Sequence, residues 1–226
     1  MDRSLPEGHR EAENQHRLKR GLPEHSLKVE HVRLCTVVPD RKSILDALPK
    51  GLVAAEVGVT FGDFTKQILG RCQPSILYLV DSWASERYAV GLASIRAELS
   101  GPISRGEVVV KQGLSSEVLP TLPNNSLDFV YIDTDHSYET TAAELLHSST
   151  KVRNGGRIAG HDYCVGNIAK PWAYGVIEAV GEFCNKYDWG FEYISLDIDG
   201  HSTFCLRRLH DLGAKNSGGN EPTALF

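Results

Sequence analysis

A strand–helix–strand segment at residues 127–162 constrains the fold of this 226-residue chain more than any other feature. Apolar runs at residues 127–132 and 155–160 each have the length and composition of a buried strand. Between them, Ser137 is the expected N-cap of a helix with Ala142, Leu145, Leu146 and Ser149 on one face. Because the joints are short, the two strands are expected to be parallel neighbours in one sheet.

Acidic and imidazole side chains follow both strands. Asp133, Asp135 and His136 come after the first strand, and His161 and Asp162 come after the second. Parallel neighbours end at the same edge of a sheet, which is where open α/β sheets bind ligands. Any one of these residues alone fits a helix cap or a turn equally well. Clustered like charges repel unless a cation or a substrate offsets them, so the group together predicts a functional site.

The rest of the chain alternates strands with helices and ends in a hairpin, marked by a turn at Asp199 and Gly200. The predicted fold is α/β, a Rossmann-like, doubly wound and mostly parallel seven-stranded sheet with a C-terminal antiparallel hairpin strand. Helices are expected at residues 41–48, 63–69, 86–99 and 171–187. The remaining expected strands are residues 53–58, 75–81, 108–113, 191–196 and 202–207.

One domain is expected, at residues 26–210. Residues 1–25 are polar and predict a flexible N-terminal segment, and residues 211–226, which contain several glycines, predict a disordered tail. Residues 26–38 fit a helix and a strand equally well. The N-terminal residues contain no apolar signal segment.

Composition excludes several classes of protein. The chain is 41% hydrophobic and 23% charged, with a net charge of −5 and no basic block, so we expect no nucleic-acid partner. No apolar run is long enough for a membrane span. Five widely spaced cysteines, Cys164 among them, suit reduced thiols, which predicts a cytoplasmic protein. A nucleophilic role for Cys164 would need a base that the sequence does not identify. A homo-oligomer is neither indicated nor excluded.

A glycine-containing turn follows the first convincing strand. Gly58 and Gly62 flank it, and Asp81 ends the next strand, where a carboxylate can accept both hydroxyls of a ribose. Nicotinamide enzymes need G-x-G-x-x-G to hold a pyrophosphate, and that pattern is absent. Glu56 would repel a pyrophosphate but attract an ammonium group. An adenosine ligand with a cationic amino-acid end and no phosphate is S-adenosylmethionine.

These residues resemble a known family. Residues 56–62 are similar to the first motif of class I S-adenosylmethionine-dependent methyltransferases, with Thr60 in place of the middle glycine, and Asp81 resembles their ribose-binding acid. Residues 131–138 and 155–163 resemble a narrower branch. That branch contains metal-assisted O-methyltransferases of sugars and glycosylated natural products, distantly similar to catechol O-methyltransferase. The resemblance covers about residues 50–208.

The resemblance implies a set of site residues. Asp133, His161 and Asp162 match positions that hold a divalent cation, and this donor set suits Mg²⁺ or Mn²⁺. His136 aligns with the catalytic lysine of the catechol enzymes and would remove the proton of an acceptor hydroxyl, with Asp133 as its catalytic neighbour. The cofactor would also contact the following residues: Gly58, Thr60, Gly62, Ser82, Trp83, Gly113, Leu114 and Asp133.

Some roles stay open in the sequence. Trp83 fits the core as well as an adenine contact, and Trp172, Tyr174 and Tyr163 fit either an acceptor site or the anchoring of the last helix. The favoured activity is metal-assisted methylation of a hydroxyl on a sugar, glycoside or other small molecule. The alternatives are a metal-independent methyltransferase with a histidine base, a nucleotide-cofactor oxidoreductase, and a non-catalytic binding protein on the same fold.

Overall fold

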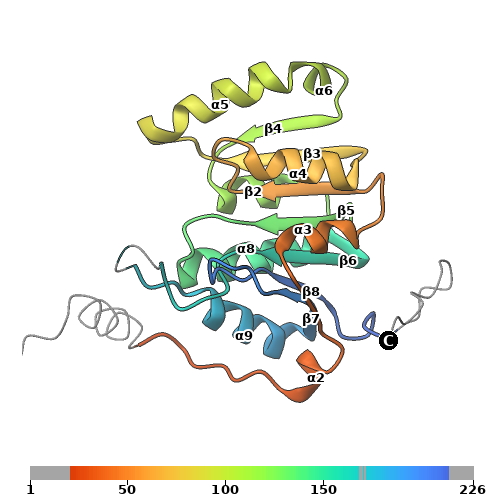
Figure 1. The fold of residues 1–226 in the computed structure, drawn as a ribbon, viewed down its shortest axis with the longest axis vertical. Helices are drawn as coiled ribbons and strands as arrows, with labels where there is room; N and C mark the ends of the chain where they lie inside the picture. Colours follow the sequence, from red (N-terminus) through yellow and green to blue (C-terminus); the bar gives the residue numbers. More distant parts are fainter. Residues whose placement is uncertain (1–20, 168–169, 171, 214–226) are drawn as a thin grey trace, which may run out of the picture.

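The computed structural model describes residues 21–167, 170 and 172–213, and Figure 1 shows their arrangement. Within this part of the chain the strands form one eight-stranded sheet in the order β1-β7-β8-β6-β5-β2-β3-β4. The strands are β1 (Thr36–Val38), β2 (Val53–Val57), β3 (Ile76–Asp81), β4 (Val108–Gln112), β5 (Leu127–Ile132), β6 (Val152–Gly160), β7 (Trp189–Ser195) and β8 (Phe204–Arg208). The helices used below are α2 (Val29–Val32), α3 (Arg41–Asp46), α4 (Asp63–Cys72), α5 (Glu86–Glu98), α7 (Ser115–Val118), α8 (Tyr138–Lys151) and α9 (Val176–Tyr187).

The predicted α/β fold is confirmed. Strand β8 is antiparallel to β6 and to β7, and the other pairs in the sheet are parallel. The structure adds one strand to the predicted seven, because β1 pairs with residues 193–195 of β7. Residues 26–38, which fitted both helix and strand, contain α2 followed by β1. A three-residue strand is too short to show an alternating pattern.

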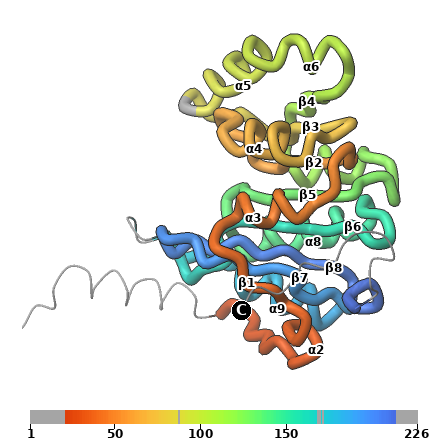
Figure 2. Tube along the Cα trace, turned by 45° about the vertical axis from the view of Figure 1, so that its right-hand side comes forward, coloured from red at the N-terminus to blue at the C-terminus, as the bar shows by residue number. Residues whose placement is uncertain are grey.

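Helices cover both faces of the sheet (Figures 1 and 2). On one face, Leu145 of α8 and Phe183 of α9 pack on the sheet, and on the other Ile44 of α3 and Ile68 of α4 do so. Successive residues of β2 alternate between the two layers and are buried in both, which explains the unbroken apolar runs that the sequence shows.

Helix α8 begins as predicted, since the Ser137 hydroxyl accepts a hydrogen bond from the Thr140 N–H. Its buried face agrees with the expected one in part. Leu145 is buried as predicted, whereas Leu146, which the pattern placed on the same face, is 41% exposed. Glu144 is buried instead, and its carboxylate breaks the apolar periodicity.

Helix α9 starts at Val176, five residues after the predicted start. The expectations for residues 1–20 and 214–226, and for Pro171, lie outside the described residues. None of the helices in the described ranges is long and apolar enough to cross a membrane.

Candidate functional site at the carboxyl edge of the sheet

The backbones at the carboxyl ends of β2 and β5 are in direct contact. The Asp133 N–H donates to the Val57 carbonyl at 2.8 Å, and a Cβ atom placed on Gly58 would lie 1.9 Å from the Asp133 carbonyl oxygen. Gly58 also has a φ of 89°. Glycine is therefore required here for both reasons, and the close contact fixes the position of the Asp133 backbone.

Asp81 holds the turn that follows Gly58. Its Oδ2 accepts the N–H groups of Val59 at 2.8 Å and Thr60 at 2.9 Å, and its Oδ1 accepts the Trp83 N–H at 2.8 Å. Thr60 has a φ of 51°, the left-handed conformation that glycine adopts at no steric cost. A carboxylate has about four lone-pair sites, and three are used here, so Asp81 retains capacity for one ligand hydroxyl.

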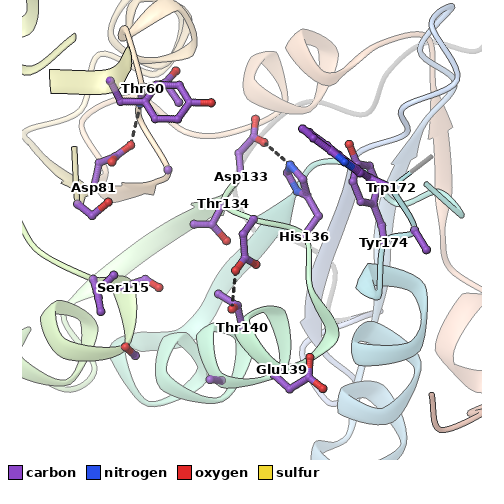
Figure 3. A pocket seen from close by; sticks show the side chains of 18 residues that line it. Thr60, Asp81, Ser115, Asp133, Thr134, His136, Glu139, Thr140, Trp172 and Tyr174 are labelled. Carbon is purple, nitrogen blue, oxygen red and sulfur yellow. Dashed lines mark hydrogen bonds and ion pairs between the residues drawn. The ribbon is translucent and has the colours of Figure 1, made fainter. Parts of the chain in front are cut away.

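One cavity of about 990 Å³ joins this turn to the end of β5, the start of α8 and residues 172–174, while His161 and Asp162 lie outside its wall. In Figure 3, Asp133 lies between Thr60 and Asp81 on one side and His136, Trp172 and Tyr174 on the other. The volume is at the upper end of the range for small-molecule sites, about 300–1,000 Å³, so it suits a cofactor together with a small acceptor. The predicted site residues that line the cavity are Gly58, Thr60, Asp81, Ser82, Leu114, Asp133 and His136.

Other predicted site residues lie outside the cavity wall. Gly62 is the N-cap of α4, and Gly113 donates its N–H to the Asp81 carbonyl. Trp83 is only 3% exposed, packs in the core, and donates its Nε1–H to the Thr60 carbonyl at 2.9 Å. Trp83 thus lies in the core, which was one of the two options that the sequence left open. Its hydrogen bond stabilises the left-handed backbone conformation of Thr60.

Glu56 is buried beside the site and does not line the cavity. Its Oε2 accepts a hydrogen bond from the Thr65 hydroxyl at 2.6 Å. Burial raises the pKa of Glu56 to about 8, and the nearby Asp133 adds to the rise while Thr65 opposes it. At neutral pH the ligand-free chain therefore holds this carboxyl mostly protonated.

Asp133, His136 and Asp162 form the chemical centre of the site. One ligating atom from each of them lies within 4.8 Å of those of the other two. His136 Nε2 is 3.0 Å from Asp162 Oδ2 and 3.9 Å from Asp133 Oδ1. The parallel strands β5 and β6 are neighbours as predicted, and their carboxyl ends bring Asp133, His136 and Asp162 together.

The charges within this centre shift its pKa values in opposite directions. Burial favours the neutral form of Asp162, but hydrogen bonds and the fields of the surrounding histidines outweigh burial and lower its pKa to about 2. Burial likewise opposes a charge on His136, yet the Asp162 hydrogen bond and the charges of Asp162, Asp133 and Asp135 together outweigh it and raise the His136 pKa. Burial raises the pKa of Asp133.

His161 and His201 complete the ring around Asp162. His161 Nδ1 is hydrogen-bonded to the Thr203 hydroxyl at 2.9 Å, while its Nε2 is 4.0 Å from Asp162 Oδ1, and burial lowers its pKa. His201 Nδ1 is hydrogen-bonded to Asp162 Oδ1. His201 is not among the predicted site residues, because the connection between β7 and β8 that carries it reaches this point only through the pairing of β8 with β6.

Aromatic and basic side chains border the centre. The Tyr174 ring lies 4.7 Å from the His136 ring, centroid to centroid, and Trp172 is 56% exposed on the cavity wall. Tyr163 instead packs against Phe191 and Phe204 in the core. Arg41, which sequence reasoning also missed, places Nη1 3.7 Å from Asp133 Oδ2. It comes from α3, more than ninety positions away in the sequence, and no motif marks it.

The donor atoms fit a divalent cation. Two ligands at about 2.1 Å from one octahedral ion lie about 3 Å apart when adjacent and about 4.2 Å apart when opposite. The separations of 3.0 and 3.9 Å from His136 to the two carboxylates fall within these limits. Two carboxylates and an imidazole are a donor set that Mn²⁺ and related ions accept.

Comparison with known proteins adds the family context. Residues 55–163 match a family described as a methyltransferase domain, and this segment runs from β2 to just beyond Asp162. No curated protein matches the sequence. This segment is therefore similar to methyltransferase domains.

Solved structures share the fold at low sequence identity. The pyocyanin biosynthetic protein PhzM is 17% identical with a TM-score of 0.57, over 74% of this chain and 53% of PhzM, so the chain spans about half the length of that protein. A putative rRNA methylase from Clostridium thermocellum is 14% identical with a TM-score of 0.57, over 76% of this chain and 97% of the other. The B. subtilis m1A22 tRNA methyltransferase TrmK is 15% identical with a TM-score of 0.54, over 76% and 66%.

Proposed function

We propose that this protein is an S-adenosylmethionine-dependent O-methyltransferase that methylates a hydroxyl of a sugar, glycoside or other small molecule with the help of a divalent cation. The observation that carries the proposal is the single cavity shared by the turn at Gly58 and Thr60, by Asp81, and by Asp133 with His136. It offers a cofactor half and a reaction half separated by one residue, Asp133.

In the cofactor half, Asp81 would accept a ribose hydroxyl, and Ser82 and Leu114 would border the adenine. Gly58 lets the backbone approach the sulfonium end closely. Glu56 would attract the cofactor's ammonium group, and a nearby cation would favour its ionised form over the protonated form of the ligand-free chain.

In the reaction half, Asp133 and Asp162, with His136 or His161, would hold Mg²⁺ or Mn²⁺. The bound cation lowers the pKa of a coordinated hydroxyl. The remaining task of the chain is to align the acceptor oxygen with the sulfonium methyl, and such alignment supplies a large part of the rate acceleration in bimolecular reactions.

With His161 as the third ligand, His136 would accept the acceptor's proton, and Asp162 would stabilise the imidazolium that forms. The 3.0 Å contact between them also favours one alternative: a metal-independent methyltransferase in which His136 and Asp162 alone activate the hydroxyl. The two candidates differ only in whether a cation is required.

The cavity wall supports a small acceptor over a nucleic acid. Four carboxylates, those of Asp81, Asp133, Asp135 and Glu139, line it together with no lysine or arginine from the described residues. A polyphosphate backbone would be repelled there. Trp172 and Tyr174 would stack on a sugar or aromatic ring. Cytoplasmic localisation and the assembly state stay predictions.

Methyl transfer from labelled S-adenosylmethionine, assayed over a panel of glycosides, catechols and tRNA, tests the proposal. Wild type and His136→Ala are compared with and without EDTA. A fall with EDTA that Mn²⁺ or Mg²⁺ restores supports the metal-assisted mechanism, whereas an EDTA-resistant rate that depends on His136 supports the alternative. Rates unaffected by both changes would reject both mechanisms.

A further inference from the structure

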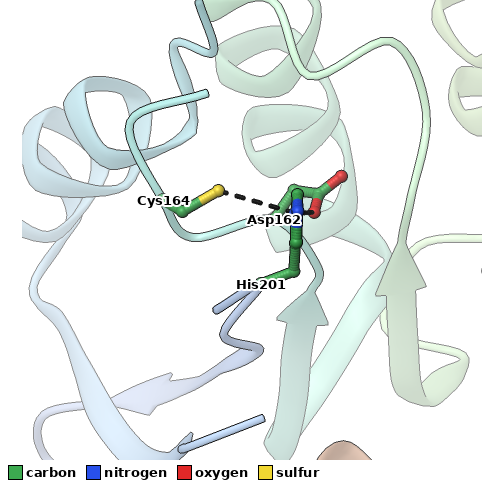
Figure 4. A group of neighbouring side chains, drawn as sticks. All are labelled: Asp162, Cys164 and His201. Atoms are coloured by element: carbon green, nitrogen blue, oxygen red, sulfur yellow. Dashed lines mark hydrogen bonds and ion pairs between the residues drawn. The ribbon is translucent and has the colours of Figure 1, made fainter. Parts of the chain in front are cut away.

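A second group of donor atoms shares Asp162 with the centre described above. Asp162, Cys164 and His201 each place one ligating atom within 4.8 Å of the other two, and Figure 4 shows the three side chains converging. Cys164 Sγ is 3.7 Å from His201 Nδ1, and His201 Nδ1 is hydrogen-bonded to Asp162 Oδ1. The group faces the carboxylate oxygen that His136 does not contact.

The backbone fixes these three side chains relative to one another. Asp162 has a φ of 58°, which turns the chain so that the Cys164 N–H donates to the Asp162 carbonyl at 2.7 Å. Tyr163, between them, donates its N–H to the Ser202 carbonyl at 2.8 Å, which ties this turn to the connection that carries His201. Two segments distant in sequence are therefore held in register at this point.

The geometry points to a binding site for a thiophilic divalent cation, of which Zn²⁺ is the representative, formed by Asp162 Oδ1, Cys164 Sγ and His201 Nδ1. A thiolate, an imidazole and a carboxylate are the ligand types that zinc takes, at about 2.3 Å for sulfur and about 2.0–2.1 Å for nitrogen. A tetrahedral ion with these bond lengths separates sulfur from nitrogen by about 3.6 Å. The 3.7 Å between Cys164 and His201 matches that separation.

Binding replaces protons by the cation. Cys164 loses its S–H proton to solvent, and His201 Nδ1 and Asp162 Oδ1, now hydrogen-bonded, move apart to about 3.4 Å so that each forms a metal–ligand bond. Three protein ligands leave a fourth position of a tetrahedral ion for water. Because Asp162 belongs to both groups, one carboxylate would connect a site of oxygen and nitrogen donors to a site that contains sulfur.

Cobalt substitution tests this site without any methyl-transfer assay, so it is independent of the proposed function. Co²⁺ is added to the purified full chain, and the near-ultraviolet thiolate-to-cobalt charge-transfer band is titrated. Wild type and Cys35→Ser, which alters a half-buried cysteine elsewhere, should give the same band. Cys164→Ser should lose it, and His201→Gln should weaken Co²⁺ binding at least about 10-fold.

Asp133→Asn separates the two groups, because Asp133 belongs only to the first. The thiolate band should persist in this variant. Zn²⁺ should remove the band from wild type at stoichiometric concentration, as expected for a shared site. The inference is overturned if wild type shows no thiolate band, if the band survives in Cys164→Ser, or if Asp133→Asn abolishes it.

Discussion

His136 Nε2 and Asp162 Oδ2 lie 3.0 Å apart, and both residues have a left-handed backbone, with φ values of 61° and 58°. Left-handed non-glycine residues each cost of the order of 1–3 kcal/mol and persist only where surrounding contacts fix them. Here the ends of β5 and β6 supply those contacts, since the His161 N–H donates to the Ile132 carbonyl at 2.9 Å. The two strained residues meet at the point where the chemistry is proposed.

Replacing Asp162 by asparagine should disable this pair. The charge that raises the His136 pKa is lost, so that pKa should fall, which a histidine NMR titration measures directly. Methyl transfer should decrease by at least about 100-fold, because general-base assistance contributes about that much or more. Asp46→Asn, in an exposed ion pair with Arg71, is the control and should match wild type in both measurements. An unchanged His136 pKa in Asp162→Asn would contradict the account of this pair.

Gly58→Ala should misplace Asp133 as well as destabilise the fold. Its Cβ would lie 1.9 Å from the Asp133 carbonyl oxygen, so one of the two strand ends must move. Gly51→Ala is a matched control, because Gly51 also has a positive φ, 73°, but nothing lies within 4 Å of its added Cβ. Gly51→Ala should lower the free energy of unfolding only by the backbone strain, about 1–2 kcal/mol. Gly58→Ala should cost clearly more in denaturant unfolding and should also weaken S-adenosylhomocysteine binding. Equal effects of the two substitutions would show that the close approach is unimportant.

Glu56 should make stability fall as pH rises. Its pKa is about 8 in the folded chain, against 4.5 for an ordinary glutamate such as that of the unfolded chain. Between these two pH values the folded state therefore holds a proton that the unfolded state releases. This contribution is complete below about pH 4.5 and is lost progressively up to about pH 8. Glu56→Gln removes the titration. The free energy of unfolding of this variant relative to wild type should therefore rise by about 3 kcal/mol between about pH 5.5 and about pH 7.5. A difference that is constant with pH would mean that Glu56 is ionised in the fold.

Trp172→Ala should weaken binding of the acceptor and leave binding of the cofactor unchanged. Trp172 is 56% exposed on the cavity wall beside Tyr174, and the loss of one stacking surface should raise the KM for the acceptor several-fold. S-adenosylhomocysteine affinity, measured by calorimetry, should stay within about twofold of wild type, which an energy change below about 0.5 kcal/mol allows. Tyr187→Ala, an exposed aromatic on α9 away from the cavity wall, should change neither quantity. A loss of cofactor affinity in Trp172→Ala alone would assign this side chain to the cofactor half.

The sequence predicts the sheet well because its strands are long, apolar and separated by helices with clear periodicity. It predicts the meeting of Asp133 with Asp162, since parallel strands on one edge leave no other arrangement. Strand β1 escapes prediction because three residues carry no period. The buried face of α8 is predicted only in part: Leu145 is buried, but Leu146 is exposed because buried Glu144 interrupts the apolar pattern.

Side-chain direction is what the sequence alone cannot supply. Glu56 and Trp83 have the expected positions in the chain but point into the interior, which depends on packing against Thr65 and Thr60. Arg41 and His201 reach the centre from distant segments whose placement follows only from the complete sheet order. Long-range register therefore decides the part of the site that local patterns leave open.

Diffraction from crystals grown with S-adenosylhomocysteine and Mn²⁺, collected for anomalous scattering from manganese, tests the central claim most directly. The account predicts a manganese peak between Asp133 and Asp162, with the ligand's ribose at Asp81 and its sulfur facing the Asp133 end of the same cavity. Manganese absent from that position, or S-adenosylhomocysteine bound away from Gly58 and Asp81, would contradict it.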